Sequence, residues 1–153
     1  MPDNVYLGNP NLKKANTAIE FTQEQILEFV KCKEDPVYFA NNYIKIVSLD
    51  EGLTQFHPYH FQEKLINNFH GNRFNICKMP RQTGKSTTVV SYLLHYAVFN
   101  DSVNIGILAN KAATARELLG RLQTAYENLP KWMQQGIIAW NKGSLELENG
   151  SKI

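Results

Sequence analysis

Cysteine is scarce in this sequence of 153 residues. Its two cysteines, Cys32 and Cys77, have no second pair and no clustered histidines around them. A disulfide framework and a zinc site both need more closely grouped ligands, so neither is expected. Two separate thiols fit a reducing, cytosolic compartment.

A strong charge of one sign is also missing. Sixteen Lys and Arg residues face fourteen Asp and Glu residues, which leaves a formal net charge of +2. This excess is too small to identify a nucleic-acid or membrane surface from bulk charge. The sequence also lacks a charged N-terminal segment before an apolar run, and no stretch is long enough to span a bilayer. We therefore expect a soluble, untargeted chain.

With 43% hydrophobic residues, the chain is long enough to bury one ordinary core, as a single domain or as a piece of a larger one. Residues 1–20 show no apolar periodicity and predict an extended N-terminal arm. Residues 21–72 predict a helical subdomain. Residues 73–153 predict an incomplete α/β core.

Local signals mark three helices in the helical subdomain. Thr22 and Gln25 form the spacing of a capping box before an apolar helical face. Asp35 followed by Pro36 can cap and start a second helix. Pro58 can open a third, which Gly-Asn at 71–72 ends.

The core begins with a strand, a loop and a helix in succession. Residues 73–78 are a strand candidate, residues 79–84 a loop, and residues 85–99 a segment of helical length. Residues 103–109 then indicate a buried strand, and Asn110 can cap a further helix. Such βαβα alternation predicts a mostly parallel sheet with helices on both faces.

Turn residues dominate the last part of the chain. Two short apolar strands flank an Asn-Lys-Gly-Ser turn at 141–144, and Asn-Gly at 149–150 indicates a second hairpin. A strand begun at Ser151 would lack its remainder, so we expect the chain to stop inside the fold.

The loop carries the main functional motif. Gly84, Lys85 and Ser86 match the end of a phosphate-binding loop, although Met79 stands where its first glycine is expected. Gly84 allows a close backbone approach to an anion, Lys85 can reach the β and γ phosphates, and Ser86 can ligate Mg²⁺. Thr87 adds a phosphate donor. Placement between a strand and a helix directs backbone N–H groups and the positive helix end at phosphate.

Two features of the loop need separate interpretation. Met79 and Pro80 imply that the first turn does not require positive φ at residue 79, so the loop is a variant. Arg81 could neutralise charge that develops on a transferred phosphoryl group, as an arginine supplied by the same chain does in some phosphoryl-transfer enzymes. The alternative is an ordinary helix start with a solvated lysine.

A loop of the form Arg-Gln-x-Gly-Lys-Ser/Thr without the leading glycine resembles that of the large terminase subunits of T4-like tailed phages. The resemblance extends from about Leu7 to Ile153. It is carried by the segments NPNLKKAN, PVYFANNY, FNICKMPRQTGKSTTVV, NIGILANKAATARELLGR and GIIAWNKGSLELENGSKI.

This resemblance implies the N-terminal part of the ATPase domain of a viral DNA-packaging motor, with a RecA/ASCE-like P-loop NTPase fold. The implied cofactors are ATP and Mg²⁺. In the parent protein, ATP hydrolysis would drive double-stranded DNA into the prohead, in a ring on the portal protein and with the small terminase subunit. A nuclease domain often follows in this family, and the implied location is the host cytoplasm, without a membrane.

The resemblance also assigns roles. Arg81 would be the cis-acting catalytic arginine, Lys85 the phosphate-binding catalytic lysine and Ser86 the magnesium ligand. Gln62 matches the glutamine that recognises adenine, whose edge an amide can pair with as donor and acceptor. The predicted ATP-binding set is Gln62, Arg81, Gln82, Thr83, Gly84, Lys85, Ser86 and Thr87.

Parts of the family pattern are absent. The sequence QFHP at 55–58 has no second glutamine at the aligned position, and no strand ending in Asp-Glu follows the loop. Glu146 and Glu148 alternate with leucines, so we expect them on the solvated face of a hairpin. His57 and His60 could stack on adenine, but packing or helix-surface positions are the simpler expectation.

Two other functions fit the same residues. A helicase or translocase of a related superfamily also has an upstream glutamine and a GK[ST] loop, and a non-catalytic assembly module could keep the loop only for packing. Lys111, Arg116 and Arg121 could contact DNA from one helix. A solvated helical face explains these three residues equally well.

Overall fold

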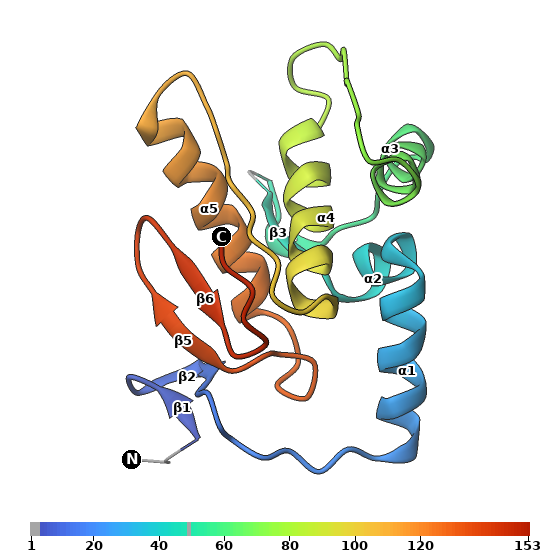
Figure 1. The fold of residues 1–153 in the computed structure, drawn as a ribbon. Helices are drawn as coiled ribbons and strands as arrows, with labels where there is room; N and C mark the ends of the chain where they lie inside the picture. Colours follow the sequence, from blue (N-terminus) through green and yellow to red (C-terminus); the bar gives the residue numbers. More distant parts are fainter. Residues whose placement is uncertain (1–3, 49) are drawn as a thin grey trace.

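The computed structural model describes residues 4–48 and 50–153, and helices dominate it (Figure 1). The helices are α1 (Gln23–Glu34), α2 (Pro36–Tyr43), α3 (His60–Gly71), α4 (Lys85–Phe99) and α5 (Ala112–Glu127). The strands are β1 (Val5–Tyr6), β2 (Asn9–Lys13), β3 (Lys45–Ser48), β4 (Gly52–Gln55), β5 (Ile137–Trp140) and β6 (Leu145–Leu147).

The helix starts confirm the local signals in the sequence. Thr22 accepts a hydrogen bond from the Gln25 backbone, and the Gln25 side chain accepts one from the Thr22 backbone, which forms the predicted capping box of α1. The Asp35 carboxylate accepts from two backbone N–H groups at the start of α2, with Pro36 at the first helical position. These side chains satisfy N–H groups that a helix start otherwise leaves unpaired.

The sheet prediction is wrong for the part of the chain that is described. The named strands form three separate antiparallel pairs, β1–β2, β3–β4 and β5–β6, and no mostly parallel sheet. Each pair joins strands that are close in sequence through a short connection, which allows only antiparallel pairing. The fold is therefore α/β with isolated hairpins.

The two segments predicted as parallel strands are extended but largely unpaired. Residues 73–78 form no strand, and residues 103–109 contribute only an isolated parallel bridge from Asn104 to Lys152. A strand needs hydrogen bonds from a neighbouring strand, and without them the side chains face water. Phe74, Ile76 and Leu108 are accordingly 82%, 101% and 91% exposed.

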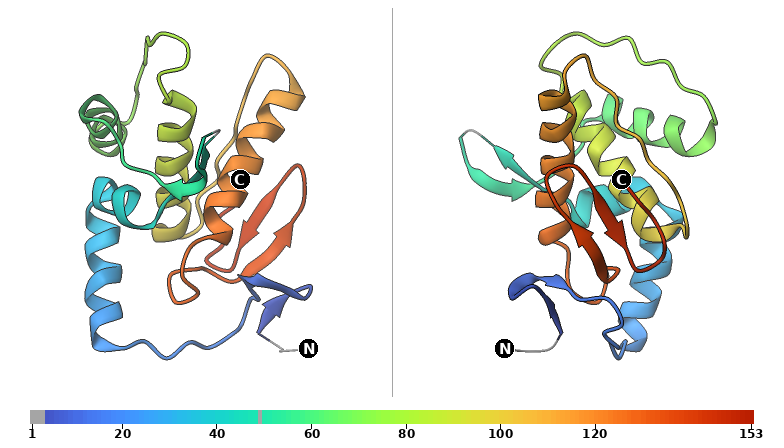
Figure 2. Two further views of the ribbon diagram at one scale, coloured as in Figure 1. Left: turned by 180° about the vertical axis from the view of Figure 1, so that it is seen from behind. Right: turned by 60° about the vertical axis from the view of Figure 1, so that its left-hand side comes forward.

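Helices α4 and α5 pack against each other and form the centre of the core. Figure 2 shows the β5–β6 hairpin beside α5, and α1, α2 and α3 on the other side of α4. The buried side chains of α4 and α5 include Val90, Leu94, Ala97, Val98, Phe99, Leu119, Leu122, Ala125 and Tyr126. No helix in the described ranges combines the length and apolar character needed to cross a membrane.

The C-terminal end of α4 is held by side chains from outside the helix. Asn149 donates to the carbonyls of Ala97 and Asn100 at 2.9 and 3.0 Å. Gln135 donates to the Val98 carbonyl at 3.0 Å, and the Ser151 hydroxyl donates to Asn100 at 2.8 Å. These bonds satisfy carbonyl groups that have no partner within the helix.

His95 lies inside the core on the same half of α4. It is 1% exposed, and its Nε2 atom lies 2.9 Å from the carbonyl oxygen of Cys32 in α1. Burial lowers the pKa of His95 to about 4, which outweighs the opposing effect of that carbonyl. The imidazole is therefore neutral near pH 7 and links α1 to α4.

The N-terminal residues dock on the C-terminal part of the chain. Leu12 is 1% exposed, and Gln134 accepts a hydrogen bond from Lys13 N and donates one to Asn11 O. Lys14 forms a parallel bridge with Ile137. The arm predicted for residues 1–20 is therefore ordered along β2 by contacts with the β5–β6 region.

The hairpin β5–β6 places its leucines inward, as predicted. Leu145 and Leu147 are fully buried, and Glu146 pairs outside with Lys152 at 2.8 Å. Glu148 is on the exposed side, yet it accepts hydrogen bonds from Gly136 N and Asn16 N. Its carboxylate thus ties the N-terminal segment to the hairpin.

Gly136 sits where two backbones nearly touch. A Cβ atom there would lie 2.5 Å from the Cα atom of Ala15 and 2.3 Å from a carboxylate oxygen of Glu148. Backbone atoms cannot yield as a flexible side chain can. Glycine is therefore required for this contact.

Candidate nucleotide site

The loop at 79–84 connects an exposed extended segment to the start of α4 (Figure 1). Positive φ occurs at Gln82, 61°, and at Gly84, 71°, but not at Met79. The prediction that the first turn needs no positive φ at residue 79 is confirmed. The left-handed turn lies instead at the residue before the helix, where glycine carries no steric penalty.

Two side chains fold back across this loop. Lys85 Nζ donates to the Pro80 carbonyl oxygen at 2.9 Å, and Thr83 Oγ1 donates to the same oxygen at 3.1 Å. The Lys85 ammonium therefore lies over the loop that precedes its own helix. A single carbonyl is a weak partner for an ammonium compared with a charged phosphate.

Gly84 begins α4 as its N-cap residue. Its carbonyl accepts hydrogen bonds from the backbone N–H and the hydroxyl of Thr88. The first N–H groups of a helix have no acceptor within it and carry partial positive charge. Lys85 and Ser86 lie in this first turn, where an anion would be stabilised.

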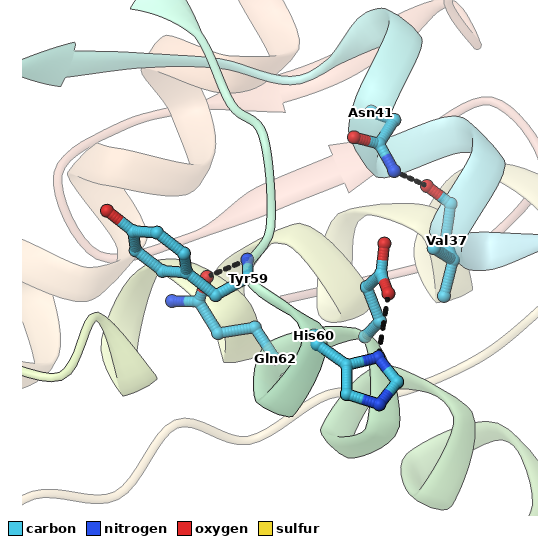
Figure 3. A network of polar contacts seen from close by, with 6 residues as sticks. Val37, Asn41, Tyr59, His60 and Gln62 are labelled. Atoms are coloured by element: carbon cyan, nitrogen blue, oxygen red, sulfur yellow. Dashed lines mark hydrogen bonds and ion pairs between the residues drawn. The ribbon is translucent and has the colours of Figure 1, made fainter.

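Gln62 connects α3 to the loop. It is 3% exposed, its Oε1 atom accepts from Tyr59 N at 2.8 Å, and its Nε2 atom donates to the Thr83 carbonyl at 3.3 Å. Figure 3 shows the bond between Gln62 and Tyr59 at the start of α3. The structure thus brings Gln62 to the predicted loop, as a hydrogen-bonding partner of its backbone.

A cleft of about 600 Å³ lies between the loop, the start of α3 and the β3–β4 hairpin. Its lining residues are Ile46, Glu51, Thr54, Gln55, Phe56, His57, Tyr59, Phe61, Gln62, Gln82, Thr83, Gly84 and Thr87. Five of the eight predicted ATP-binding residues line it. Arg81, Lys85 and Ser86 do not, and Arg81 is exposed.

An exposed aromatic pair stands at the cleft. The rings of Tyr59 and Phe61 stack with centroids 5.9 Å apart and planes 11° from parallel, and the residues are 71% and 46% exposed. His60 instead pairs with Glu63 on the surface of α3 at 3.5 Å (Figure 3). His57 lines the cleft, so only one of the two histidines considered in the sequence does so.

Sequence reasoning missed the wall formed by β3 and β4. Ile46, Glu51 and Thr54 bring this hairpin to the cleft. The apolar residues of β3 are a local signal for a strand. The contact of this hairpin with the loop depends on long-range packing, which no local signal indicates. Gln55 also lines the cleft, with its amide donating to the carbonyls of Asn41 and Ile44.

The basic residues considered for DNA contact are Lys111, Arg116 and Arg121. They lie on or just before α5 and do not line the cleft. Arg121 pairs with Glu117 at 2.7 Å, and Arg116 donates to the Ala112 carbonyl of its own helix. Both contacts are local to the surface of α5. They fit the solvated helical face, and DNA contact by these residues stays a prediction.

A comparison with known families adds a direct assignment. The family model described as "Terminase large subunit, T4likevirus-type, N-terminal" matches residues 76–153, just over half of the chain. The chain belongs to this terminase family. The match includes the loop, α4, α5 and the β5–β6 hairpin, so the motif and the helix it opens lie within the terminase region. Gln62 lies outside the matched residues.

Proposed function

We propose that the loop of this terminase chain binds ATP with Mg²⁺ to power the packaging of double-stranded DNA. The observation that supports ATP binding is the start of α4: a left-handed Gly84 before Lys85, beside a cleft of about 600 Å³. A helix N-terminus offers N–H groups and positive potential to a phosphate chain. Family membership supports the packaging role.

In this proposal the nucleotide replaces a bond within the loop. Lys85 leaves the Pro80 carbonyl and pairs with the β and γ phosphates, because a charged acceptor gives the stronger hydrogen bond. Gly84, Gln82, Thr83 and Thr87 border the phosphates from the loop and the first turn of α4. Gln62 belongs to the same site through Thr83.

Magnesium fits a hydroxyl ligand at Ser86, because this cation prefers oxygen ligands and keeps several waters beside substrate phosphates. Within the described parts of the chain, no three His, Cys, Asp or Glu side chains gather where a metal ion could be held. The phosphates and several waters would therefore supply the remaining oxygens. Arg81, exposed in the loop, would stabilise charge on the transferred phosphoryl group.

The wider setting follows from the family. We infer a role in the large subunit of a DNA-packaging terminase, which would act with the portal protein and the small subunit as a ring on the prohead in the host cytoplasm. ATP hydrolysis would drive DNA movement, and a nuclease in the same large subunit would cut the DNA. The family match favours this setting over a helicase.

Titration of a fluorescent ATP analogue, with and without Mg²⁺, tests the site. We expect Lys85→Ala to weaken binding by at least about tenfold, because a charge-assisted contact with phosphate is lost. Lys142→Ala is the matched control, since Lys142 is exposed in the turn between β5 and β6. Equal affinities of wild type and Lys85→Ala would contradict ATP binding by this loop and favour the assembly module.

A further inference from the structure

Gln62 has a place in the site that its family role does not explain. Resting on the proposed binding of ATP, we propose that Gln62 is a positioning residue: it holds the phosphate loop in shape through the Thr83 carbonyl. It thereby sets part of the affinity for the triphosphate, whether or not a base is attached. This role is additional to the recognition of adenine that the family resemblance implies.

The side-chain amide of Gln62 makes one hydrogen bond to the start of α3 and one to the loop. Oε1 accepts from Tyr59 N at 2.8 Å, and Nε2 donates to Thr83 O at 3.3 Å, so the amide joins two segments that are 21 residues apart in sequence. One donor and one lone pair of the amide are thereby used. Because Gln62 is only 3% exposed, the amide is held in this position by its surroundings.

The bond to Thr83 also fixes the orientation of the peptide group between Thr83 and Gly84. A trans peptide is planar, with its C=O and N–H groups pointing in opposite directions. When Thr83 O is held toward Gln62, the Gly84 N–H is directed away from Gln62. A single side-chain hydrogen bond thus fixes the orientation of a backbone donor at the loop's last residue.

Packing around Gly84 supports the same role. A Cβ atom on Gly84 would lie 2.5 Å from Gln62 Nε2, and the φ of 71° already favours glycine. The amide therefore lies directly against the backbone of this residue. Gln62 and Gly84 fit together as a pair, and a change in either would shift the start of α4.

This role makes a prediction that adenine recognition does not. If Gln62 shapes the loop, its loss weakens every ligand that carries the triphosphate, including one without a base. If Gln62 only recognises adenine, its loss weakens ATP and leaves GTP and inorganic tripolyphosphate unchanged. The two roles therefore differ in a measurable ratio.

The experiment compares dissociation constants of Mg²⁺-bound ATP, GTP and tripolyphosphate for the whole chain, with tripolyphosphate measured by competition. For Gln62→Met we expect the binding of GTP and tripolyphosphate to weaken roughly fivefold, which corresponds to the lost hydrogen bond to Thr83, and that of ATP to weaken at least as much. Gln123→Met is the matched control. Gln123 is a partly exposed glutamine on α5 that donates to the Asn141 carbonyl and does not line the cleft, so all three ligands should bind normally.

Gln62→Leu is the second variant, in case the methionine packs poorly at the start of α3. Leucine also cannot donate to Thr83 O, and it adds no charge that would itself repel the phosphates, so we again expect tripolyphosphate to bind more weakly. A loss confined to ATP in either variant overturns the positioning role while ATP binding stands. Failure of the wild type to bind any of the three ligands overturns ATP binding, and the positioning role with it.

Discussion

The two ends of α4 differ in what surrounds them. At the C-terminal end, Asn149 and Gln135 satisfy the last carbonyls, and the neighbouring side chains are buried. At the N-terminal end, the preceding loop is exposed, and Lys85 reaches only the nearby Pro80 carbonyl. The C-terminal end is held by several bonds from the rest of the fold, whereas the loop at the N-terminal end is tied to α3 by the single bond from Gln62 to Thr83.

This difference shows how α4 would hold the proposed phosphate site in place. A binding loop must accommodate its ligand, so it has few packing contacts of its own, and its position depends on the rigid element that follows. The buried half of α4 supplies that rigidity. Changes at the two ends should therefore affect different properties, stability at one and ligand binding at the other.

The largest effect is expected in the buried half. Leu94→Ala should lower the free energy of unfolding by about 3 kcal/mol, because Leu94 is fully buried and its truncation leaves a cavity. Urea denaturation measures the loss. Leu108→Ala is the matched control: with 91% exposure it should change stability by less than about 0.5 kcal/mol. Equal losses would contradict the assignment of these two environments.

A pH dependence of stability should arise from His95. Its pKa of about 4 in the folded protein lies below the ordinary value of 6.5, so the unfolded chain takes up the proton first as the pH falls. Stability is complete above pH 6.5 and is lost toward pH 4. From pH 7.5 to pH 5 the loss should be about 2 kcal/mol.

Thermal or urea unfolding across that range measures the effect of His95. Nearby charges act on it as well: His70 lowers its pKa further, and Asp35 raises it. His95→Gln can still donate to the Cys32 carbonyl but does not titrate, so its stability should vary less with pH. An identical pH profile in both proteins would show that His95 is not responsible.

The smallest of these effects concerns the carbonyls at the end of α4. Asn149→Ala should destabilise the fold by roughly 1–2 kcal/mol, because the Ala97 carbonyl loses its donor and the Asn100 carbonyl keeps only the Ser151 hydroxyl. Asn110→Ala, at an exposed position before α5, serves as the control and should be nearly neutral. We also expect ATP affinity to be unchanged in Asn149→Ala, since the loop lies at the opposite end of α4.

Helices could be predicted from the sequence because their signals are local. The Thr22 capping box, the Asp35-Pro36 start and the apolar segment at 85–99 all act within a few residues. The structure confirms all three. For the helix after residue 109, the sequence predicts Asn110 as the cap, and the structure places the cap one residue later, at Lys111.

Strands depend on neighbours that periodicity cannot supply. Residues 73–78 and 103–109 have the apolar character of buried strands, but each lacks a strand alongside it in the described chain. Order in the N-terminal arm was equally hidden, because Leu12 is a single apolar residue whose burial depends on distant contacts such as that between Lys13 and Gln134. Strand propensity is a property of one segment, whereas strand pairing requires two segments that meet in the fold.

The candidate site also has one part that local sequence predicts and one part that depends on long-range packing. The residues at 81–87 are contiguous, and their motif predicted a loop followed by a helix, which the structure contains. The partners of Gln62 could not be predicted, because Thr83 is brought to it by the packing of α3 against α4. Ligand roles for all of these residues stay predictions until binding is measured.

The close approach at Gly136 has a consequence for the order of folding. The surface that receives residues 11–16 is built from residues 134–148, so the contacts span most of the chain. Contacts between such distant residues form slowly, since a long loop must close first. During synthesis, the N-terminal strand emerges from the ribosome long before its binding surface exists. Residues 11–16 therefore reach their final position only after residues 134–148 have been made and folded.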